Sequence, residues 1–465
     1  MRRILIIGFI IMFVSYSCSN REDDVGKTKH LSEENLRTVN GCGNLSEDEA
    51  LETLSSFING FSTTKNGVTE VTVISKRKKL VSDYSSSQIP MTIKSVTGEP
   101  VVSVDTIPIY EFIMSENGNE GFALVAGHSL YNDVLAYSEN GSLADTTFNE
   151  GLSLFLSSIS KNISSSIEDN LHCLDNKTKA YWQDSSGAMK VLDETEEYLG
   201  MVWGEKELRK ICPYDRGNGP WTEFKTYGSP IFTQWGQEAP YNDRVSVICR
   251  NGRARVGCVP VAFAQIIAHH RVGSYNWDLL TSSQKILSSS PAKQRSEVSR
   301  LMKDIADDLG TSYSCRDNGS VGSTYSVRLL PTLNKMGLSG IYYSPYRAVK
   351  SDTIRSNVSK NMPVLVVAKA DTLNLVTNSI NFAHHVWIID GLSERYRNYY
   401  YWLQGWDNND NVYFKVWKYK QRGLHIHCNW GWGGKSDGWY RYFTPVNTNY
   451  EFYDFSLITQ IKPKR

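Results

Sequence analysis

The sequence has little net charge and no long run of basic residues. Its 50 Lys and Arg residues nearly balance 49 Asp and Glu residues, which gives a formal net charge of +1. A protein that binds nucleic acid through the phosphates needs a concentrated basic surface. The composition therefore argues against nucleic acid as the main partner. With 40% hydrophobic and 21% charged residues, the chain is expected to fold rather than to be disordered throughout.

The N-terminus lacks an apolar run long enough to cross a bilayer comfortably. Arg2 and Arg3 are followed by an apolar stretch of 11 residues, from Ile4 to Val14. A transmembrane helix needs about 20 apolar residues. A positive start followed by a short apolar stretch is typical of a cleaved export signal.

The end of this stretch is similar to a bacterial lipoprotein signal, because small residues lead into Cys18. In such signals the cysteine is lipidated and becomes the new N-terminus. We therefore expect a signal peptide over 1–17, lipidation at Cys18 and a polar tether over 18–44. Tyr16 is unusual there, so ordinary signal-peptide cleavage nearby is the alternative. The expected location is the outer membrane or cell surface of a bacterium, or the medium after processing, with the membrane contacted only through the lipid.

The cysteines show no CxxC pair and no regular spacing. There are eight: Cys18, Cys42, Cys173, Cys212, Cys249, Cys258, Cys315 and Cys428. Disulfides are possible in an exported chain. A domain of this size does not require them, however, and several cysteines could be buried thiols. The pairing stays open.

A length of 465 residues favours two domains. The capping box Ser46–Glu49 starts a helix, strand-like runs follow, and Asn117-Gly118 separates two of them as a hairpin turn would. We expect a small α+β domain over 45–160. The polar, Ser-rich segment 161–228 predicts an irregular linker whose basic residues a protease could cut.

The second domain, over 229–465, has its helix-forming segments first, including Lys293–Leu309. Strand-like runs follow, at Val364–Ala368, Val386–Ile389, Asn411–Trp417, Leu424–Trp430 and Trp439–Phe443. Helices first and an antiparallel sheet afterwards is an α+β arrangement.

Cys258 is the first candidate for chemistry. It precedes a dozen uncharged, mostly apolar residues that predict a buried helix, with Pro260 in the first turn where proline is tolerated. The free N–H groups and the dipole of a helix N-terminus stabilise a thiolate. A buried structural cysteine is the alternative interpretation.

His385 is the second candidate, because it leads into the apolar strand Val386–Ile389. An imidazole beside a thiol can act as its base. His384 has the same chemistry, but adjacent strand residues point to opposite faces, so only one of the two can reach the thiol.

Asn429, Trp430 and Gln237 could complete such a site. An Asn side chain or a backbone carbonyl can fix the imidazole tautomer, and an indole can shield that hydrogen bond from water. Gln237, 21 residues before Cys258, could add a side-chain amide to the Cys258 backbone N–H as an oxyanion hole. Gln234 offers the same amide.

Together these stretches resemble the streptopain family of papain-like cysteine peptidases, over roughly 229–460. The motifs are Gly-Cys-Val followed by Ala-x-Ala-Gln-Ile, then His-x-x-x-Ile-Asp-Gly, then Asn-Trp-Gly-Trp-Gly-Gly-x-x-Asp-Gly. The resemblance implies a papain-like domain, with its nucleophile helix packed on an antiparallel sheet. Cys258 would be the nucleophile, His385 the general base and acid, and Gln237 the oxyanion-hole donor, with Asn429 and Trp430 orienting and shielding the histidine. The 45–160 domain resembles the inhibitory propeptide of the family.

The expected function is therefore an exported cysteine endopeptidase made as a zymogen, with protein or peptide substrates and its own propeptide as inhibitor. No cofactor is implied. Three alternatives remain: a metal enzyme built on His425, His427 and Cys428 or on His384-His385, a non-catalytic surface lipoprotein that binds peptides, and a peptidoglycan amidase or acyltransferase. The first would require a second pair of ligands that the spacing does not offer, and His269-His270 suit a helix C-terminus.

Overall fold

The computed structural model describes most of the chain from residue 44 onward. The described residues are 44–62, 71–84, 92–94, 100–103, 106–116, 118–128, 131–164, 166, 208–213, 221–316, 319–323, 328–343, 351–376, 379–406, 412–441 and 452–464. The predicted signal peptide, Cys18 and all but the last residue of the tether lie outside them. Within the described part, no helix is long and apolar enough to span a membrane.

The N-terminal unit (44–164) is an antiparallel sheet between two helices. Its strands are β1 (Thr72–Leu80), β4 (Pro108–Glu116), β5 (Asn119–His128) and β6 (Tyr131–Ser138). Leu54 and Phe57 of α2 (Glu47–Ser62) pack on one face, and apolar residues of a helix over 150–164 pack on the other. Short elements complete it, namely η1 (Val81–Tyr84), β2 (Thr92–Lys94), β3 (Pro100–Ser103) and η3 (Leu143–Thr147).

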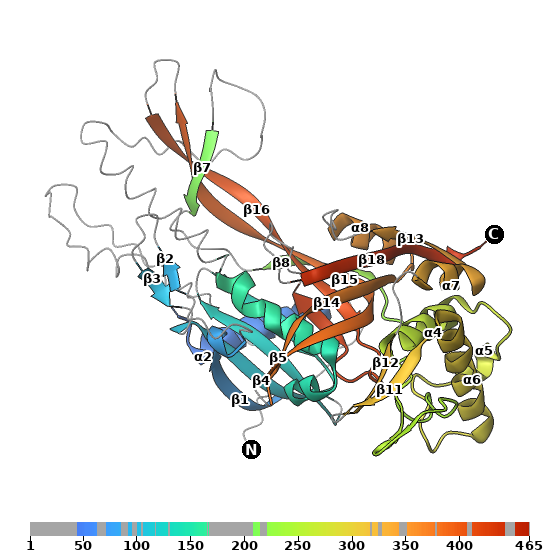
Figure 1. Ribbon diagram of the computed structural model, residues 1–465. Coiled ribbons are helices and arrows are strands. Elements are labelled where there is room, and N and C mark those ends of the chain that lie inside the picture. The colour runs from blue at the N-terminus through green and yellow to red at the C-terminus, as the bar shows by residue number, and fades with distance from the viewer. Residues whose placement is uncertain are drawn as a thin grey trace, which may run out of the picture.

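The C-terminal unit (221–464) continues the same sheet. Its strands follow in the order β17 (Gly438–Arg441), β16 (Val412–Asn429), β15 (Ser379–Trp406), β14 (Val364–Asn374), β18 (Phe452–Pro463) and β13 (Leu338–Tyr343). Strands β7 (Leu208–Pro213) and β8 (Thr222–Gly228) also pair with β15. Strand β6 pairs with β17 through Trp439–Tyr137 and Tyr440–Ala136, which joins the two units into one 12-stranded sheet (Figure 1).

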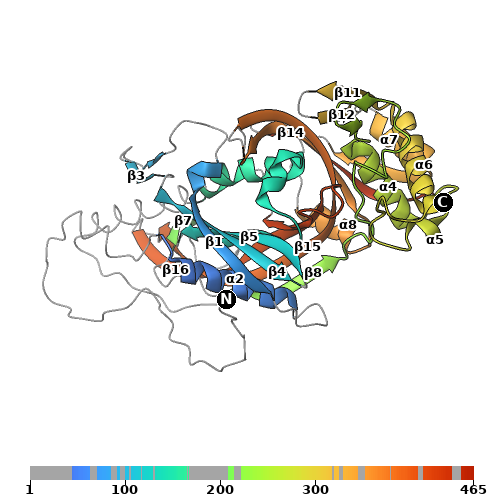
Figure 2. The ribbon, with the colours of Figure 1, turned by 90° about the horizontal axis from the view of Figure 1, so that it is seen from below.

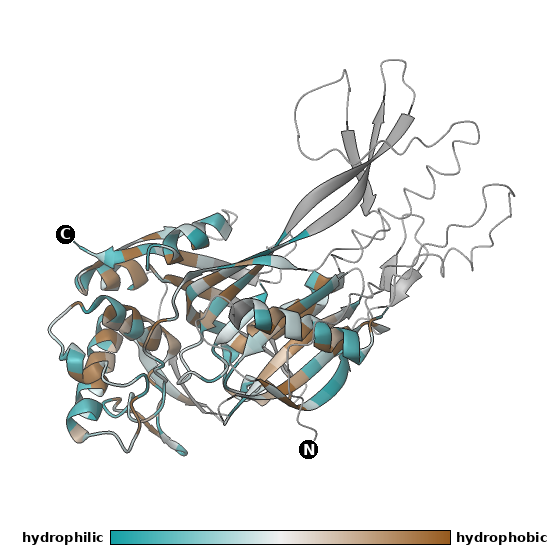
Figure 3. Cartoon of the chain, turned by 180° about the vertical axis from the view of Figure 1, so that it is seen from behind, coloured by the Kyte–Doolittle hydropathy of each residue, from teal (hydrophilic) through white to brown (hydrophobic). Residues whose placement is uncertain are grey.

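Helices gather at the far side of this sheet from the N-terminal unit (Figures 1 and 2). They are α4 (Cys258–His270), α5 (Trp277–Leu280), α6 (Ala292–Leu309), α7 (Leu329–Lys335) and α8 (Ser351–Val358). Buried side chains of α4 and α6, such as Phe263 and Leu301, share a core with Ile388 of β15. Figure 3 shows the apolar residues concentrated where helices and strands face one another.

Two small hairpins flank the helical part. They are β9 (Ile248–Cys249) with β10 (Gly252–Arg253), and β11 (Ser312–Arg316) with β12 (Gly319–Ser323). A disulfide between Cys249 and Cys315 joins the two hairpins. The structure thus gives the pairing of these two cysteines, which the sequence spacing left open.

The predicted α+β architecture is confirmed, including the capped helix at Ser46, the hairpin around Gly118 and the helix that ends at Leu309. The prediction that 161–228 is irregular throughout is wrong, because β7 and β8 lie in it. The two runs predicted over 411–430 form the single strand β16. In both places polar residues interrupt the apolar pattern, while pairing with β15 supplies the backbone hydrogen bonds.

Candidate active site

Cys258 is the first residue of α4, as its sequence context predicts. Gly257 precedes it with a φ of +99°, a conformation that favours glycine and turns the loop sharply into the helix. The ten residues that follow from Val259 to Ala268 are all buried. The thiol is free and partly buried, so the nucleophile candidate lies where the loop enters the core and the first N–H groups of the helix are unpaired.

His385 lies on β15 beside this thiol. The backbone N–H of Val386, the next residue, is within hydrogen-bonding reach of the Cys258 sulfur and opposes the rise that burial causes in the pKa of this thiol. The His385 side chain is 1% exposed, and its Nε2–H donates to the Trp430 carbonyl at 3.0 Å. His384 is exposed, as strand alternation requires.

Two indoles surround the imidazole. The His385 and Trp387 rings are nearly parallel with centroids 6.0 Å apart, and the Trp430 ring lies 6.4 Å away. Trp430 is 2% exposed. Trp430 therefore offers both functions named from the sequence, a backbone carbonyl that fixes the tautomer and a ring that excludes water. With the proton on Nε2, the nitrogen left to accept a proton is Nδ1.

Gln237 is buried next to the start of the nucleophile helix. Its carbonyl accepts a hydrogen bond from Val256, two residues before Cys258, at 3.0 Å. Its side-chain Nε2 is buried and has no hydrogen-bond partner among the described residues. A buried unpaired donor is costly, so the position suits a group reserved for a developing oxyanion. The Gln234 side-chain oxygen instead lies close to Gly434.

Asn429 does not hydrogen-bond to the imidazole. Its amide bonds to the side chain of Gln265, the carbonyl of Thr233 and the N–H of Gly431. Among the predicted pair, Trp430 is the residue that contacts His385. Gln265 is a residue of the site to which sequence reasoning gave no role, and its position in an otherwise apolar helix was the available signal, since a fully buried amide requires partners.

The N-terminal unit contacts the site through the start of its helix over 150–164. Glu150 Oε2 lies 3.7 Å from His385 Nδ1. A Cβ at Gly151 would lie 2.3 Å from Trp430 Cε3 and 2.6 Å from His385 Cδ2, so this backbone packs directly on the imidazole and the indole. Nothing in the sequence around 150 signalled this contact, which depends on how the two units dock.

The charge state of the site follows from this packing. Burial, and next the Glu150 carboxylate, raise the pKa of Cys258 to about 12, although backbone N–H groups lower it. Burial lowers the pKa of His385 to about 4, against the effect of the Trp430 carbonyl. Both shifts favour the neutral thiol and the neutral imidazole over the thiolate–imidazolium pair while the N-terminal unit is docked.

A polar loop of the N-terminal unit also binds the glycine-rich turn after Trp430. Ser138 Oγ donates to the Asp437 carbonyl at 2.7 Å. Asn140 accepts from the Ser436 N–H at 2.7 Å, and Asp145 accepts from the Ser436 hydroxyl at 2.8 Å. The turn that presents the Trp430 carbonyl is thus held from both units.

A third contact lies where β6 meets β17, away from the thiol. Asp133 of β6 pairs with Arg395 of β15 and with Arg441 of β17, the latter at 3.0 Å. His425 Nε2–H donates to the Val134 carbonyl at 2.7 Å. Asp133, Arg395 and His425 are all at most 4% exposed, so removing the N-terminal unit would expose charged groups that are now paired.

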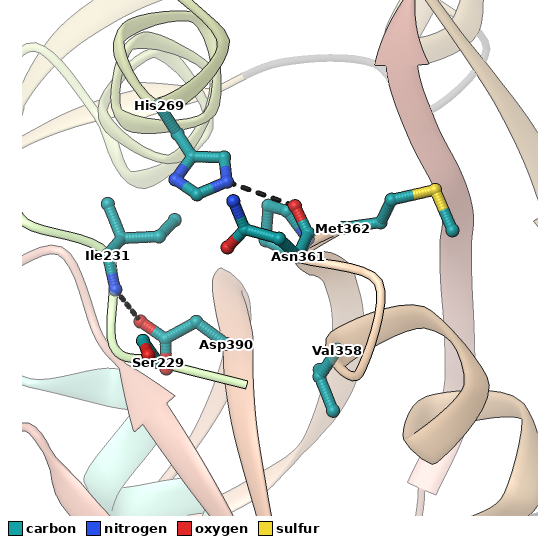
Figure 4. Close-up of a pocket in the computed structure, with 8 residues that line it drawn as sticks. Ser229, Ile231, His269, Val358, Asn361, Met362 and Asp390 are labelled. Carbon is teal, nitrogen blue, oxygen red and sulfur yellow. Dashed lines mark hydrogen bonds between the residues drawn. The ribbon is translucent and has the colours of Figure 1, made fainter. Parts of the chain in front are cut away.

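The remaining histidine candidates have other contacts. His427 Nδ1 lies 2.6 Å from Asp390 Oδ1, and His269 and His270 occupy the last turn of α4. A shallow hollow lies between His269, Ile231 and Val358 (Figure 4). It is at the end of α4 opposite to Cys258, roughly 16 Å away along the helix axis, so it is not part of the candidate site.

The fold and the site together define the class of this protein: a cysteine-type peptidase preceded by an inhibitory domain. Residues 235–274 and 271–440 match the model of the Peptidase C10 family, and residues 43–163 match the model of the Spi protease inhibitor. Residues 235–440 thus belong to the Peptidase C10, or streptopain, family, and residues 43–163 match its inhibitor-type domain. From here on the N-terminal unit is called the prodomain and the C-terminal unit the peptidase domain.

Two solved structures from Prevotella intermedia are similar to this chain. A mutant fragment of prointerpain A is 15% identical with a TM-score of 0.46, covering 84% of this chain and all of that chain. The active wild-type interpain A cysteine protease is 17% identical with a TM-score of 0.35, covering 50% of this chain and 94% of that chain. A search of curated protein sequences gave no match.

Proposed function

We propose that the protein is a cysteine endopeptidase made as a zymogen, with Cys258 as nucleophile and His385 as general base and acid. The thiolate attacks the carbonyl carbon of a peptide bond, and the new oxyanion is bound by the Cys258 backbone N–H and Gln237 Nε2. The imidazolium then protonates the leaving amine, which departs and leaves a thioester. Water, deprotonated by the imidazole, hydrolyses the thioester and restores the thiol.

One observation carries this proposal: three groups with complementary roles meet at the start of α4. Cys258 lies at the helix N-terminus within hydrogen-bonding reach of the N–H next to His385, His385 keeps Nδ1 as its proton acceptor, and Gln237 Nε2 is a buried donor without a described partner. Each arrangement is costly for a purely structural protein and useful for acyl transfer.

We further propose that the prodomain inhibits by contact with the catalytic pair. Glu150 and Gly151 lie against His385 and Trp430. Burial, to which this packing contributes, raises the pKa of Cys258 and lowers that of His385, and the Glu150 carboxylate raises the Cys258 pKa further. Cleavage within 161–228 would free the prodomain, readmit water and allow the ion pair to form. The peptidase would thus stay inactive until that cleavage.

The test is the Cys258→Ala precursor, with Cys428→Ala as a matched control that removes a buried thiol, the second of the two free thiols in the described part of the chain. We expect Cys258→Ala to abolish self-processing and casein cleavage, and E-64 to label wild type and Cys428→Ala but not Cys258→Ala. Chelators should leave the activity unchanged. If Cys258→Ala still matures and cleaves casein like wild type, the nucleophile is another residue.

For localisation we propose export and lipidation at Cys18, supported by the apolar stretch Ile4–Val14 that ends in small residues before a cysteine. Radiolabelled palmitate should label the wild-type chain in a bacterial host, and Cys18→Ser should lose the label and leave the membrane fraction. Retention of both by Cys18→Ser would favour ordinary signal-peptide cleavage.

A further inference from the structure

Gln265 and Asn429 form a reciprocal amide pair in the middle of the peptidase domain. Gln265 Nε2 donates to Asn429 Oδ1 at 3.0 Å, and Asn429 Nδ2 donates to Gln265 Oε1 at 3.2 Å. Gln265 is fully buried and Asn429 is 3% exposed. The two amides therefore exchange a pair of hydrogen bonds away from solvent.

Backbone groups fix the orientation of both amides. The Trp235 N–H requires an acceptor and meets Gln265 Oε1 at 3.0 Å. The Gly431 N–H meets Asn429 Oδ1 at 3.2 Å, and the Thr233 carbonyl accepts from Asn429 Nδ2 at 3.2 Å. A flip of either amide would oppose two donors or two acceptors, so this hydrogen-bond pattern is the one that satisfies all groups.

The pair joins the three segments that supply the candidate catalytic groups. Gln265 lies on α4, two turns after Cys258. Its hydrogen bond with the Trp235 N–H holds the loop that runs on to Gln237. Asn429 holds the turn in which the next carbonyl, that of Trp430, accepts a hydrogen bond from His385. Gly433 and Trp235 add a backbone hydrogen bond of 3.0 Å between the same two segments.

We infer that Gln265 and Asn429 are positioning residues that act as one unit, setting the Trp430 carbonyl, and through it His385, relative to Cys258. Asn429 thereby affects the histidine through its backbone neighbour and not by contact with the ring. This inference rests on the proposed roles of Cys258 and His385. A small shift of the turn would weaken the Nε2–H bond that stabilises the imidazolium, and misplacements of about 1 Å lower rates by about 100-fold.

The test uses the full-length precursor, cut with trypsin, with the trypsin then blocked by a serine-protease inhibitor. The variants are Gln265→Met, Asn429→Leu and their combination, with the concentration of competent enzyme taken from E-64 titration. We expect each single change to lower kcat by about 10- to 100-fold with KM nearly constant. The alkaline limb of kcat/KM should move to lower pH, because the imidazolium loses a stabilising acceptor.

Gln294→Met is the matched control. Gln294 is also a buried glutamine, 3% exposed, and its Nε2 donates to Leu279, Ser282 and Ser283 on the far side of α6. We expect this variant to lose stability as Gln265→Met does but to keep wild-type kcat and pH profile per competent enzyme. The comparison separates positioning from general loss of a buried amide.

Non-additivity decides whether the two residues act as a unit. We expect the double variant to be no slower than the slower single variant, since either change already breaks the pair. Multiplicative losses, or a Gln265→Met enzyme with the kcat and pH profile of Gln294→Met, would overturn the inference. A wild-type enzyme without E-64-sensitive activity would instead overturn the proposed function.

Gln265→Glu provides a second test in case the other variants do not fold. As a neutral acid this side chain donates and accepts like the amide, whereas its carboxylate cannot donate to Asn429. We expect its activity relative to wild type to rise as the pH falls, which Gln265→Met should not show. A constant ratio at all pH values contradicts the inference.

Discussion

Two of the regions in which the prodomain meets the peptidase domain are opposite in character. In the first, the site contact, Glu150 and Gly151 lie against His385 and Trp430. In the second, the sheet junction, β6 pairs with β17 and Asp133 lies between Arg395 and Arg441. The Glu150 side chain is 42% exposed, whereas the Asp133 side chain is 5% exposed.

The difference separates binding from inhibition. Removing one partner of a buried ion pair leaves an uncompensated charge and is strongly destabilising. Undocking the prodomain would do this at the sheet junction, so this region is suited to hold the prodomain. A half-exposed carboxylate contributes little binding energy, but at 3.7 Å from the imidazole it is suited to oppose the thiolate. Three variants, from the largest to the smallest expected effect, test this division.

The largest effect is expected at the sheet junction. Asp133→Ala leaves two arginines without a buried counter-charge and should weaken prodomain docking by about 3–5 kcal/mol. We expect the unprocessed precursor to become active and trypsin-sensitive, measured by peptide hydrolysis and by urea unfolding.

Glu47→Gln is the control for this change. It breaks the exposed Lys76–Glu47 pair of the prodomain, at 2.9 Å, which should cost between zero and about 1 kcal/mol. An Asp133→Ala precursor as latent and as stable as Glu47→Gln would show that the junction does not hold the prodomain.

An intermediate effect is expected at Gly151. The Cβ of Gly151→Ala would overlap Trp430 and His385, and overpacking of this kind costs about 1–3 kcal/mol. At an unhindered helix position the same change is stabilising by about 1 kcal/mol. We therefore expect faster self-processing and lower precursor stability; slower processing with higher stability would mean that the contact relaxes freely.

The smallest effect is expected at Glu150, and it depends on pH. Burial raises the pKa of Glu150 to about 7, against the opposing charge of Arg255, although solvent reaches part of the side chain and weakens the shift. The docked contact then favours the protonated acid. The stabilisation of the docked prodomain by protonated Glu150 is complete below the ordinary glutamate pKa of about 4.3. It declines as the pH rises to about 7.

The measurement is the rate at which a fixed amount of matured enzyme converts the precursor. The ratio of wild type to Glu150→Gln cancels the pH profile of the converting enzyme. We expect this ratio to rise several-fold from pH 5 to pH 8, and iodoacetamide to alkylate Cys258 faster in Glu150→Gln, because the charge that raises the thiol pKa is gone. A ratio independent of pH contradicts a role for the Glu150 charge.

Several features could be predicted from the sequence because they depend on local rules. The capping box at Ser46 and the helix that begins at Cys258 follow from local residue patterns. Strand alternation predicted that only one of His384 and His385 reaches the thiol, and the structure shows that His385 is the buried one. Strand β8 was missed because its polar residues carry no apolar pattern, and its pairing with β15 is a long-range property.

Within the site, residue type and motif led to Cys258, His385, Gln237 and Trp430, and the structure places all four around the start of α4. Asn429 was predicted as a site residue, but its hydrogen-bond partners were not. A side-chain amide in a motif indicates that a hydrogen bond is made, but the partner depends on which segments pack beside it, here Gln265 of α4 and the loop at Thr233.

The sequence by itself determined the peptidase chemistry, since a thiol, an imidazole and an amide have their reactivities wherever they lie, and their motifs specify the order in the chain. Only the tertiary structure decided that the prodomain packs against this pair. Glu150 is more than a hundred residues from both Cys258 and His385, and its effect on the Cys258 pKa requires the docked sheet that joins β6 to β17. Electrostatics depends on distance and on exclusion of water, and both are properties of the folded whole.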